Sequence, residues 1–474
     1  MRPEAVMSMA DSGHVKLAYG KARKYFPVFV LAALTGVMGG TIGGVFHLSV
    51  DRVFDLRTFL AQTAERLYDL GWLASMSFSA VMTLAAVGLV RRFAPEASGS
   101  GVQEIEGALS GVRPLRWKRV LPVKFIGGVL SIGGGMVLGR EGPTIQMGAG
   151  GGRMLCELFH LDDPQVRHSL VAAGAGAGLA AAFNAPLAGI LFIVEEMRRQ
   201  FRFNFVSFHC VVIASAASDI MVRLICGPAQ DIPMRLFPMP ALSSLLLFLF
   251  FGCCIGVIGF FFNYLLVATL DICARIEAKT IVPMSLTLGA IIGLLLWFFP
   301  DAAGGGHRAL LRALGGGTAV ELLALAFVLR LATTFFSYGS GAPGGIFAPM
   351  LALGTLFGLV FGNFGHEYFP GLIEHPDMFA VAGMGALFAA TVRAPVTGLV
   401  LVMEMTLNYS LTLPLIVTCM SSAITAEILG GRPIYTVLLE RALNLSQGTS
   451  QETVLEQADS LHEENPSSEN NPPI

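Results

Sequence analysis

Long apolar stretches without a charged residue recur along the chain. Such stretches, with no Asp, Glu, Lys or Arg, include residues 25–50, 71–90, 241–270, 280–300, 331–365 and 405–426. A helix needs about 20 mostly apolar residues to cross the hydrocarbon core of a membrane. Each stretch is long enough, so the pattern predicts an all-α polytopic membrane protein.

The basic residues between these stretches predict an orientation. The residues just before the first stretch include Lys16, Lys21, Arg23 and Lys24, and the second stretch is followed by Arg91, Arg92, Arg113, Arg116, Lys118, Arg119 and Lys124. The intervening segment, Asp51 to Leu70, mixes acids and bases and is expected to be a loop. Because Lys and Arg accumulate on the cytoplasmic side, the N-terminus is expected in the cytoplasm. The first apolar run is too long for the core of a signal peptide.

The two halves of the chain resemble each other. Residues 133–148 (GGGMVLGREGPTIQMG) match 339–354 (GSGAPGGIFAPMLALG) at an offset of 206, with four glycines and one proline in common. Residues 173–195 match 382–404 at an offset of 209, and each of these segments ends in a glutamate. Similar glycine-rich helices could agree by composition alone, but the shared spacing favours a repeat. Such halves are typical of transporters built from inverted repeats.

This repeat divides the chain into five predicted parts. Four prolines near the midpoint, Pro228, Pro233, Pro238 and Pro240, indicate a linker. The parts are a cytoplasmic segment at 1–26, a first membrane repeat at 27–225, the linker at 226–240, a second repeat at 241–440 and a polar tail at 441–474. The tail is acidic, is expected to be disordered and is placed in the cytoplasm.

Glycine and proline interrupt the same places in both halves. Broken helices are tolerated within a membrane where their backbone is buried in protein or lines a cavity. Their N-termini expose N–H groups and about half a positive charge, which suits an anion. Partial charges bind an anion without trapping it as a full Lys or Arg charge could. Other glycines, such as Gly174 and Gly383, are expected to let helices pack closely. The pattern predicts an anion pathway.

The composition argues against several other classes of protein. Only 14% of the residues are charged and 54% are hydrophobic, far from the composition of a soluble protein. A net charge of −2 gives no basic footprint for nucleic acid. Seven cysteines without a CxxC pair, and isolated histidines such as His47, show no metal-ligand spacing. No metal and no cofactor are expected.

Four ordered motifs resemble the CLC family of chloride channels and transporters, most closely its bacterial members. The first three resemble its selectivity filter: Gly99, Ser100, Gly101, Val102 and Gln103; Gly139, Arg140, Glu141, Gly142 and Pro143; Gly345, Ile346, Phe347, Ala348 and Pro349. The fourth, residues 432–435, resembles the segment that supplies the filter tyrosine, Tyr435. The first motif departs from the family, because Val102-Gln103 stands where Ile-Pro is usual. The resemblance extends from about residue 27 to 443.

The resemblance implies a homodimer in the lipid membrane with one anion pathway in each subunit. It implies that chloride contacts the hydroxyl groups of Ser100 and Tyr435 and the backbone amides of Ile346 and Phe347. Hydroxyl groups can donate to an anion without adding a charge. Two alternatives stay open: Ser100 could be a helix N-cap, and Tyr435 could belong to an aromatic belt at the membrane interface.

Glu141 is the most informative residue. It lies inside an apolar, glycine-rich segment, and its repeat equivalent is Phe347. An ionisable group at membrane depth is by default a functional-site hypothesis. As a carboxylate, Glu141 can occupy an anion site, and when protonated it can leave that site. It matches the gating glutamate of the family. The alternative is a structural partner for Arg140.

Glu195 and Glu196 follow the apolar run 186–194. Adjacent helical residues point about 100° apart, so only one of them can face a shared pathway. Glu195 matches Glu404, which suggests a structural role in both halves, whereas Glu196 matches Met405. The resemblance makes Glu196 the internal proton-transfer glutamate found in transporters. The alternative is that both glutamates end a helix beside Arg198 and Arg199. Glu104 and Glu106 are interpreted as making structural contacts, with Lys124 as a candidate partner.

Together these observations predict an antiporter that exchanges chloride for protons in a bacterial inner membrane. Chloride, protons and lipid are its expected partners. The alternative within the same family is a passive chloride channel, against which Glu196 argues. An enzyme or receptor is disfavoured because the sequence shows no nucleophile–base pair, metal cluster or output domain.

Overall fold

The computed structural model describes residues 3–228, 232–276, 278–315, 318–371 and 373–444, with the backbone alone for 3–24. Within these ranges the fold is all-α, as predicted, and its only β-type contacts are two isolated bridges. Nine helices in the described part of the chain are long and apolar enough to cross a membrane. The predicted tail, 441–474, falls almost entirely outside the described residues.

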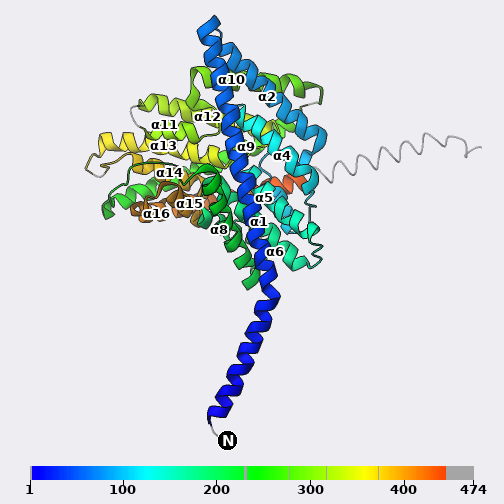
Figure 1. Ribbon diagram of the computed structural model, residues 1–474. Coiled ribbons are helices and arrows are strands. Elements are labelled where there is room, and N and C mark those ends of the chain that lie inside the picture. Colours follow the sequence, from blue (N-terminus) through cyan, green and yellow to red (C-terminus); the bar gives the residue numbers. More distant parts are fainter. Residues whose placement is uncertain (1–2, 229–231, 277, 316–317, 372, 445–474) are drawn as a thin grey trace, which may run out of the picture.

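Eight helices make up the first half. They are α1 (Pro3–Tyr68), α2 (Gly71–Phe93), α3 (Val102–Leu109), α4 (Trp117–Gly133), α5 (Glu141–Leu158), α6 (Pro164–Phe183), α7 (Pro186–Glu195) and α8 (Phe205–Cys226). Helix α1 runs through the body and extends well beyond it at the N-terminal end (Figure 1). The prediction of a loop from Asp51 to Leu70 is wrong, because helix α1 continues to Tyr68. Phe54 in this part of α1 packs against a cluster that includes Ile292 and Leu296 of α10. Helix α1 also contacts α2 and α4.

Eight further helices make up the second half in the same order. They are α9 (Leu245–Ala274), α10 (Ile281–Phe298), α11 (His307–Leu314), α12 (Val320–Gly339), α13 (Phe347–Tyr368), α14 (Asp377–Val392), α15 (Pro395–Thr406) and α16 (Thr412–Ile428), and residues 434–444 are also helical. Short 3₁₀ turns join some of them: η1 (Pro95–Ala97), η2 (Leu242–Ser244), η3 (Ala278–Thr280), η4 (Pro300–Ala302) and η5 (Tyr409–Leu411). Residues 232–241, between the halves, are not helical.

Two spanning helices, α6 and α8, are missing from the predicted spans. Most of α6 lies in residues 168–194, which are also free of charge but were not counted as a span, whereas α8 carries Asp219 and Arg223. The charges of α8 neutralise each other, since Arg223 Nε lies 2.8 Å from Asp219 Oδ2. A search for uncharged segments therefore could not find α8.

The same local signals begin and end equivalent helices. Pro186 opens α7 and Pro395 opens α15, where the missing N–H of proline costs no helical hydrogen bond. Asn184 and Arg393 end α6 and α14 in the left-handed conformation, with φ of 53° and 70°. Helices α7 and α15 are too short to span the membrane, and they pack against each other across the two halves.

Close helix packing at glycine is confirmed in both halves. A Cβ on Gly174 of α6 would collide with the carbonyl of Gly148 in α5, and a Cβ on Gly383 of α14 would collide with the carbonyl of Gly354 in α13. These contacts bring α5 against α6 and α13 against α14. The buried pairs hold the N-termini of α5 and α13 in the centre of the protein.

Candidate anion and proton site

The N-termini of α5 and α13 meet through two equivalent glycines. The Gly139 amide donates to the Gly345 carbonyl at 2.7 Å, and the Gly345 amide donates to the Gly139 carbonyl at 2.7 Å. Helix α5 begins two residues later at Glu141, and α13 begins two residues later at Phe347. In the described structure, neither N-cap residue, Arg140 or Ile346, caps its helix with a side chain. Both helix ends therefore keep amides available for an anion.

The first filter motif joins this meeting point. The Gly99 amide donates to Ala342 O at 3.2 Å, and Gly344 N donates to Gly99 O at 3.0 Å. A Cβ at Gly142 would collide with Ser100, so the Ser100 loop lies directly against the start of α5. The three predicted motifs thus come together although about 250 residues of sequence separate the first from the last.

Ser100 is buried, and its hydroxyl group is not a helix cap. Helix α3 has Gly101 as its N-cap, at a φ of 88°, with no side-chain cap. Ser100 Oγ is buried and lacks a hydrogen-bond partner among the described residues. The capping alternative is therefore wrong. A buried hydroxyl group without a partner costs free energy, which a bound anion would recover.

Tyr435 is the second such hydroxyl group. The side chain is completely buried, and its Oη also has no hydrogen-bond partner in the described part of the chain. This burial excludes the alternative of an interfacial aromatic residue. Tyr435 is close enough to Ser100 for the two hydroxyl groups to influence each other. Apart from each other, these two buried hydroxyl groups have no hydrogen-bond partner among the described residues.

Two residues that no sequence motif singled out hold the first filter motif in place. Lys124 is fully buried, and its Nζ donates to Ala97 O at 3.0 Å and to Gly99 O at 2.6 Å. The Ser100 amide donates to Tyr338 Oη at 3.4 Å. Lys124 is thus a positioning residue for the motif. The structural contact expected for Glu104 is confirmed, with Arg113 Nε at 2.8 Å as its partner.

The carboxylate of Glu141 lies at the N-terminus of α13, which belongs to the second repeat. Glu141 is 1% exposed, and its Oε2 accepts a hydrogen bond from the Ala348 amide of α13 at 3.3 Å. An anion would seek this position, because the helix end carries partial positive charge. Glu141 can therefore compete with a transported anion for the end of α13.

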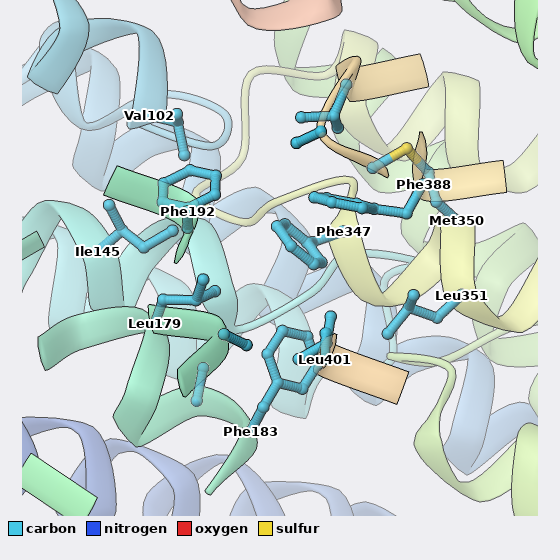
Figure 2. Packing of buried hydrophobic residues seen from close by; sticks show 14 of the residues in the cluster. Val102, Ile145, Leu179, Phe183, Phe192, Phe347, Met350, Leu351, Phe388 and Leu401 are labelled. Atoms are coloured by element: carbon cyan, nitrogen blue, oxygen red, sulfur yellow. The ribbon is translucent and has the colours of Figure 1, made fainter. Parts of the chain in front are cut away.

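Phe347 occupies the equivalent position in α13 and has apolar surroundings. Its ring centroid lies 4.2 Å from that of Phe388, 5.3 Å from Phe183 and 6.3 Å from Phe192. Figure 2 shows the Phe347 ring between side chains of the first half, such as Phe183, and those of the second half, such as Phe388. Equivalent positions therefore hold an acid in one repeat and a core aromatic ring in the other.

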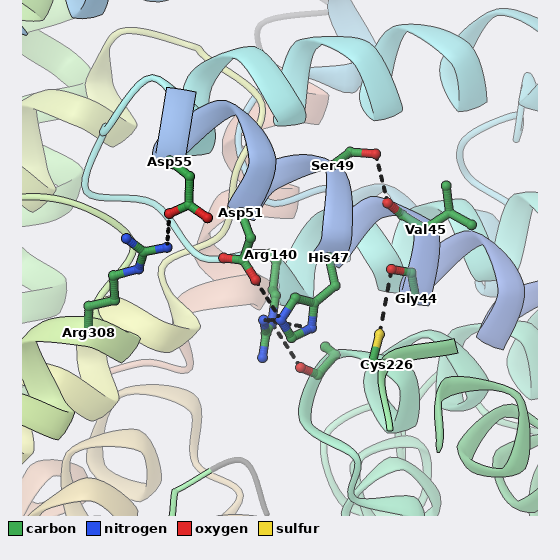
Figure 3. Close-up of polar contacts among 10 residues, drawn as sticks. Gly44, Val45, His47, Ser49, Asp51, Asp55, Arg140, Cys226 and Arg308 are labelled. Atoms are coloured by element: carbon green, nitrogen blue, oxygen red, sulfur yellow. Dashed lines mark hydrogen bonds and ion pairs between the residues drawn. The ribbon is translucent and has the colours of Figure 1, made fainter. Parts of the chain in front are cut away.

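A cavity of about 540 Å³ opens on Glu141, and we call it the Glu141 cavity. Arg140 lies in its wall, where Nε donates to Ala182 O at 2.9 Å and one terminal nitrogen lies 2.8 Å from the His47 ring nitrogens. His47 Nε2 also lies 3.1 Å from Asp51 Oδ2 (Figure 3). These contacts make Arg140 a structural and field-setting charge. His47 was not predicted to take part, because no local pattern surrounds it.

A second cavity, of about 660 Å³, reaches Ser98, Gly99, Gln103 and Tyr338, and we call it the Ser98 cavity. Arg91, at the end of α2, also lines it, whereas the C-terminal half of α1 lines the Glu141 cavity. Arg57, in the wall of the Glu141 cavity, contacts Ser75 near the start of α2, whereas Arg91 lies at the end of α2. The two cavities therefore lie toward opposite ends of α2. They are candidates for the two entrances of a pathway.

Glu195 and Glu404 each accept hydrogen bonds from backbone amides of the other half. This confirms their shared structural role. Glu195 accepts from the amides of Val396 and Thr397 at 3.0 and 2.6 Å, at the start of α15. Glu404 accepts from the amides of Leu187 and Ala188 at 3.0 and 2.7 Å, at the start of α7. Each carboxylate thus caps the short helix of the other half.

Glu196 follows α7 and is partly buried. It interacts electrostatically with Glu106, whose side chain is 1% exposed and whose Oε2 has no hydrogen-bond partner among the described atoms. A second acid therefore lies near Glu196. The sequence alone predicted only structural contacts for Glu106, because its partner in space lies 90 residues away in the chain.

Comparisons with known proteins agree with this geometry. The sequence model of one protein family, described as voltage gated chloride channel, matches residues 82–427. The chain is 49% identical over 426 residues to the H(+)/Cl(-) exchange transporter ClcA of Vibrio cholerae, which covers 89% of this chain and 91% of that protein. It is also 49% identical over 420 residues to the protein of the same name from Klebsiella pneumoniae, covering 88% and 89% of the two chains.

Solved structures share the fold. A slow cyanobacterial Cl⁻/H⁺ antiporter superposes with a TM-score of 0.85 at 43% sequence identity, over 88% of this chain and 98% of that one. A CLC-type fluoride/proton antiporter superposes with a TM-score of 0.69 at 19% identity, over 86% and 97% of the two chains, and supports the fold alone.

Proposed function

Because the chain belongs to the voltage gated chloride channel family, we propose that it exchanges chloride for protons across a bacterial inner membrane. The similar transporters named above are exchangers, and they cover most of this chain. Antiport is therefore favoured over the alternative of a passive channel.

One observation carries the proposal: the Glu141 carboxylate lies at the amide end of α13. In this position an ionised Glu141 blocks the site that a chloride ion would take. A proton removes the charge of Glu141 and its attraction to the helix end, so the side chain can leave and an anion can enter. Glu141 therefore either occupies the anion position itself or takes up a proton and vacates it for chloride, which couples the two movements.

The chloride path follows from the two buried hydroxyl groups and the helix ends. We assign the chloride contacts to the hydroxyl groups of Ser100 and Tyr435 and to the amides of Ile346 and Phe347. The lack of other partners for both hydroxyl groups, among the residues that the structure describes, supports this assignment. These donors offer partial charges only, so a chloride ion can bind and still leave. The Ser98 cavity and the Glu141 cavity would then be the two approaches.

The proton path needs a second titratable group on the far side of Glu141. We assign that role to Glu196, because it departs from its repeat equivalent Met405 and lies beside the buried acid Glu106. Glu195, the alternative at the same helix end, is occupied in capping α15. Protons would pass between Glu196 and Glu141 on a route partly separate from the chloride path.

Reconstituted protein tests the exchange directly. Liposomes are loaded with chloride and placed in low chloride, and a chloride electrode and a pH electrode record both ions together. We expect the outward chloride gradient to drive protons into the vesicles against a proton gradient. Chloride efflux without uphill proton movement would assign the protein to the channel alternative.

We further infer that the protein is a homodimer with its N-terminus in the cytoplasm, as the resemblance and the basic segments imply. The partly exposed carboxylates of Glu195 and Glu404 lie beside exposed Leu187 and Val396 on α7 and α15. Carboxylates on a membrane-embedded surface are costly against lipid, so a second copy is the better neighbour. Leu187→Lys should therefore give monomers in detergent by light scattering, whereas the control Val328→Lys on exposed α12 should leave dimers.

A further inference from the structure

The Glu141 cavity is richer in cations than the filter chemistry requires. Four arginines line it, Arg57, Arg140, Arg308 and Arg312, against two carboxylates, Asp51 and Glu141. Asp51 is paired with His47, and Glu141 accepts from the Ala348 amide. Arg312 is paired with Asp301 at 2.7 Å, so the positive excess of the wall comes from the other three arginines.

Arg57 is the least compensated of these cations. Its side chain is 5% exposed, and its terminal nitrogens donate to two neutral hydroxyl groups, Ser75 Oγ at 2.8 Å and Thr58 Oγ1 at 3.3 Å. Within the described residues it forms no ion pair, and its Nε has no hydrogen-bond partner. Burying a guanidinium without a counter-charge is costly, so the site favours a negative ion beside it.

Arg308 brings a second guanidinium to the same aromatic ring. The guanidinium carbons of Arg57 and Arg308 lie 4.6 and 4.3 Å from the centroid of Phe54. The two charges repel each other. Arg308 is paired with Asp55 at 2.7 Å, but Asp55 is not part of the cavity wall (Figure 3). The single acid therefore leaves the pair of arginines with an excess charge that faces the cavity.

We propose that the Glu141 cavity holds an anion subsite of its own, in which Arg57 and Arg308 bind chloride beside Phe54 before the ion reaches the filter. This inference rests on the proposed exchange function. The subsite differs from the filter in its chemistry, because full guanidinium charges replace backbone amides and hydroxyl groups. It raises the local concentration of chloride in front of Glu141, as a positively charged cleft does for its substrate.

One substitution that removes a positive charge and one that removes a negative charge distinguish an anion subsite from an ion pair that has only a structural role. Arg308→Gln and Asp55→Asn both break the Arg308–Asp55 pair, but the first removes a cation and the second frees one. Chloride–chloride exchange is measured with equal chloride on both sides of the vesicle, so that the orientation of the molecules does not matter. We expect Arg308→Gln to raise the half-saturating chloride concentration about threefold and Asp55→Asn to lower it by a similar factor.

Arg66→Gln is the matched control, because Arg66 is exposed on the same helix and lies outside the cavity wall. It should leave the half-saturating concentration unchanged. If Arg308→Gln and Asp55→Asn shift this concentration in the same direction, or neither shifts it, the subsite is refuted.

Anomalous diffraction locates the ion without relying on transport. Crystals of the full-length protein grown in bromide should show a bromide peak beside the guanidinium groups of Arg57 and Arg308, and the peak should weaken in Arg308→Gln. Bromide in the filter alone would overturn the proposal. A protein that moves no chloride but binds bromide in the cavity would refute the exchange function and keep the subsite.

Discussion

Helices α5 and α13 begin at equivalent points of the two repeats but differ in the residue that opens them. Gly139 and Gly345 pair with each other symmetrically, so the backbone of the two helix ends is the same. Glu141 opens α5, whereas Phe347 opens α13 and packs in a cluster of phenylalanine rings. In the function that we propose, the repeat supplies two helix ends for an anion, and Glu141, which departs from the repeat, carries the proton.

A second pair of positions shows the same division. Glu195 and Glu404 are alike, and each caps a helix of the other half. Their neighbours differ: Glu196 lies near Glu106, whereas Met405 is buried and contacts the Glu141 cavity. We propose that the glutamates shared by both repeats build the scaffold, whereas Glu141 and Glu196, which have no acidic equivalent in the second repeat, carry the proton. The substitutions below test this division, from the largest expected effect to the smallest.

Replacing Glu141 should have the largest effect. Glu141→Ala removes the group that takes up the proton and competes with chloride, so chloride flux should continue while chloride-driven proton uptake falls about 100-fold or more. The two-electrode liposome assay measures both fluxes. The matched control is Phe347→Leu in the equivalent position, which should keep the coupling. Proton pumping that survives in Glu141→Ala would refute the assigned role.

Glu196→Met makes the first repeat like the second at this position. We expect proton transport to disappear while chloride flux persists, because the chloride contacts of Ser100 and Tyr435 are untouched. Glu196→Gln should behave in the same way, which would show that the loss comes from the acid and not from the shape of methionine. Uphill proton uptake in either variant, measured with the pH electrode, would contradict this interpretation.

Ser100→Pro should change the preference among anions. It removes a buried hydroxyl donor worth roughly 1 kcal/mol, so chloride should lose about fivefold against nitrate, in line with the family resemblance. Competition between the two anions in the liposome flux assay measures this ratio. Ser110, whose hydroxyl group donates to Glu106 O away from the filter motifs, offers the control Ser110→Ala. An unchanged ratio in Ser100→Pro would remove Ser100 from the filter.

Substitutions of Glu195 and Glu404, the glutamates that both repeats share, should change the stability of the protein and leave transport intact. Glu195→Gln and Glu404→Gln each weaken one helix cap and should lower the free energy of unfolding by roughly 1 kcal/mol, by similar amounts in the two repeats. Thermal unfolding in detergent measures the change. Both variants should still pump protons, and Glu196→Gln should keep its stability. Loss of coupling in Glu195→Gln would overturn the distinction between Glu195 and Glu196.

The parts of the site that lie in local motifs could be predicted from the sequence. Ser100, Glu141 and Phe347 stand in short glycine-rich segments, and the offset of 206 residues relates two of these segments through the sequence alone. The structural role of Glu195 and Glu404 followed from their agreement between repeats, and their reciprocal caps confirm it.

Residues that reach the site from elsewhere could not be predicted in this way. Lys124 looks like one more basic residue of a cytoplasmic segment, and only the fold turns its Nζ toward the carbonyls of Ala97 and Gly99. His47 and Arg140 are 93 residues apart, and Glu106 and Glu196 are 90 residues apart. Their contacts depend on how α1, α3 and α7 pack, which no pattern within one segment encodes.

The spanning helices show the same limit. A charge-free stretch is a sufficient sign of a span but not a necessary one, because α8 keeps Asp219 and Arg223 as a pair. The segment after Asp51 was expected to be a loop since it mixes charges, yet its polar residues lie on a helix that also supplies Phe54 and Arg57 to a cavity wall.

The central claim is that the Glu141 carboxylate occupies an anion site at the end of α13. Anomalous diffraction from crystals of Glu141→Gln grown in bromide tests it most directly. We predict a bromide ion within hydrogen-bond distance of the Ala348 amide in the variant and its absence from this position in the unsubstituted protein. An Ala348 amide without bromide in the variant, while other sites are filled, would contradict the claim.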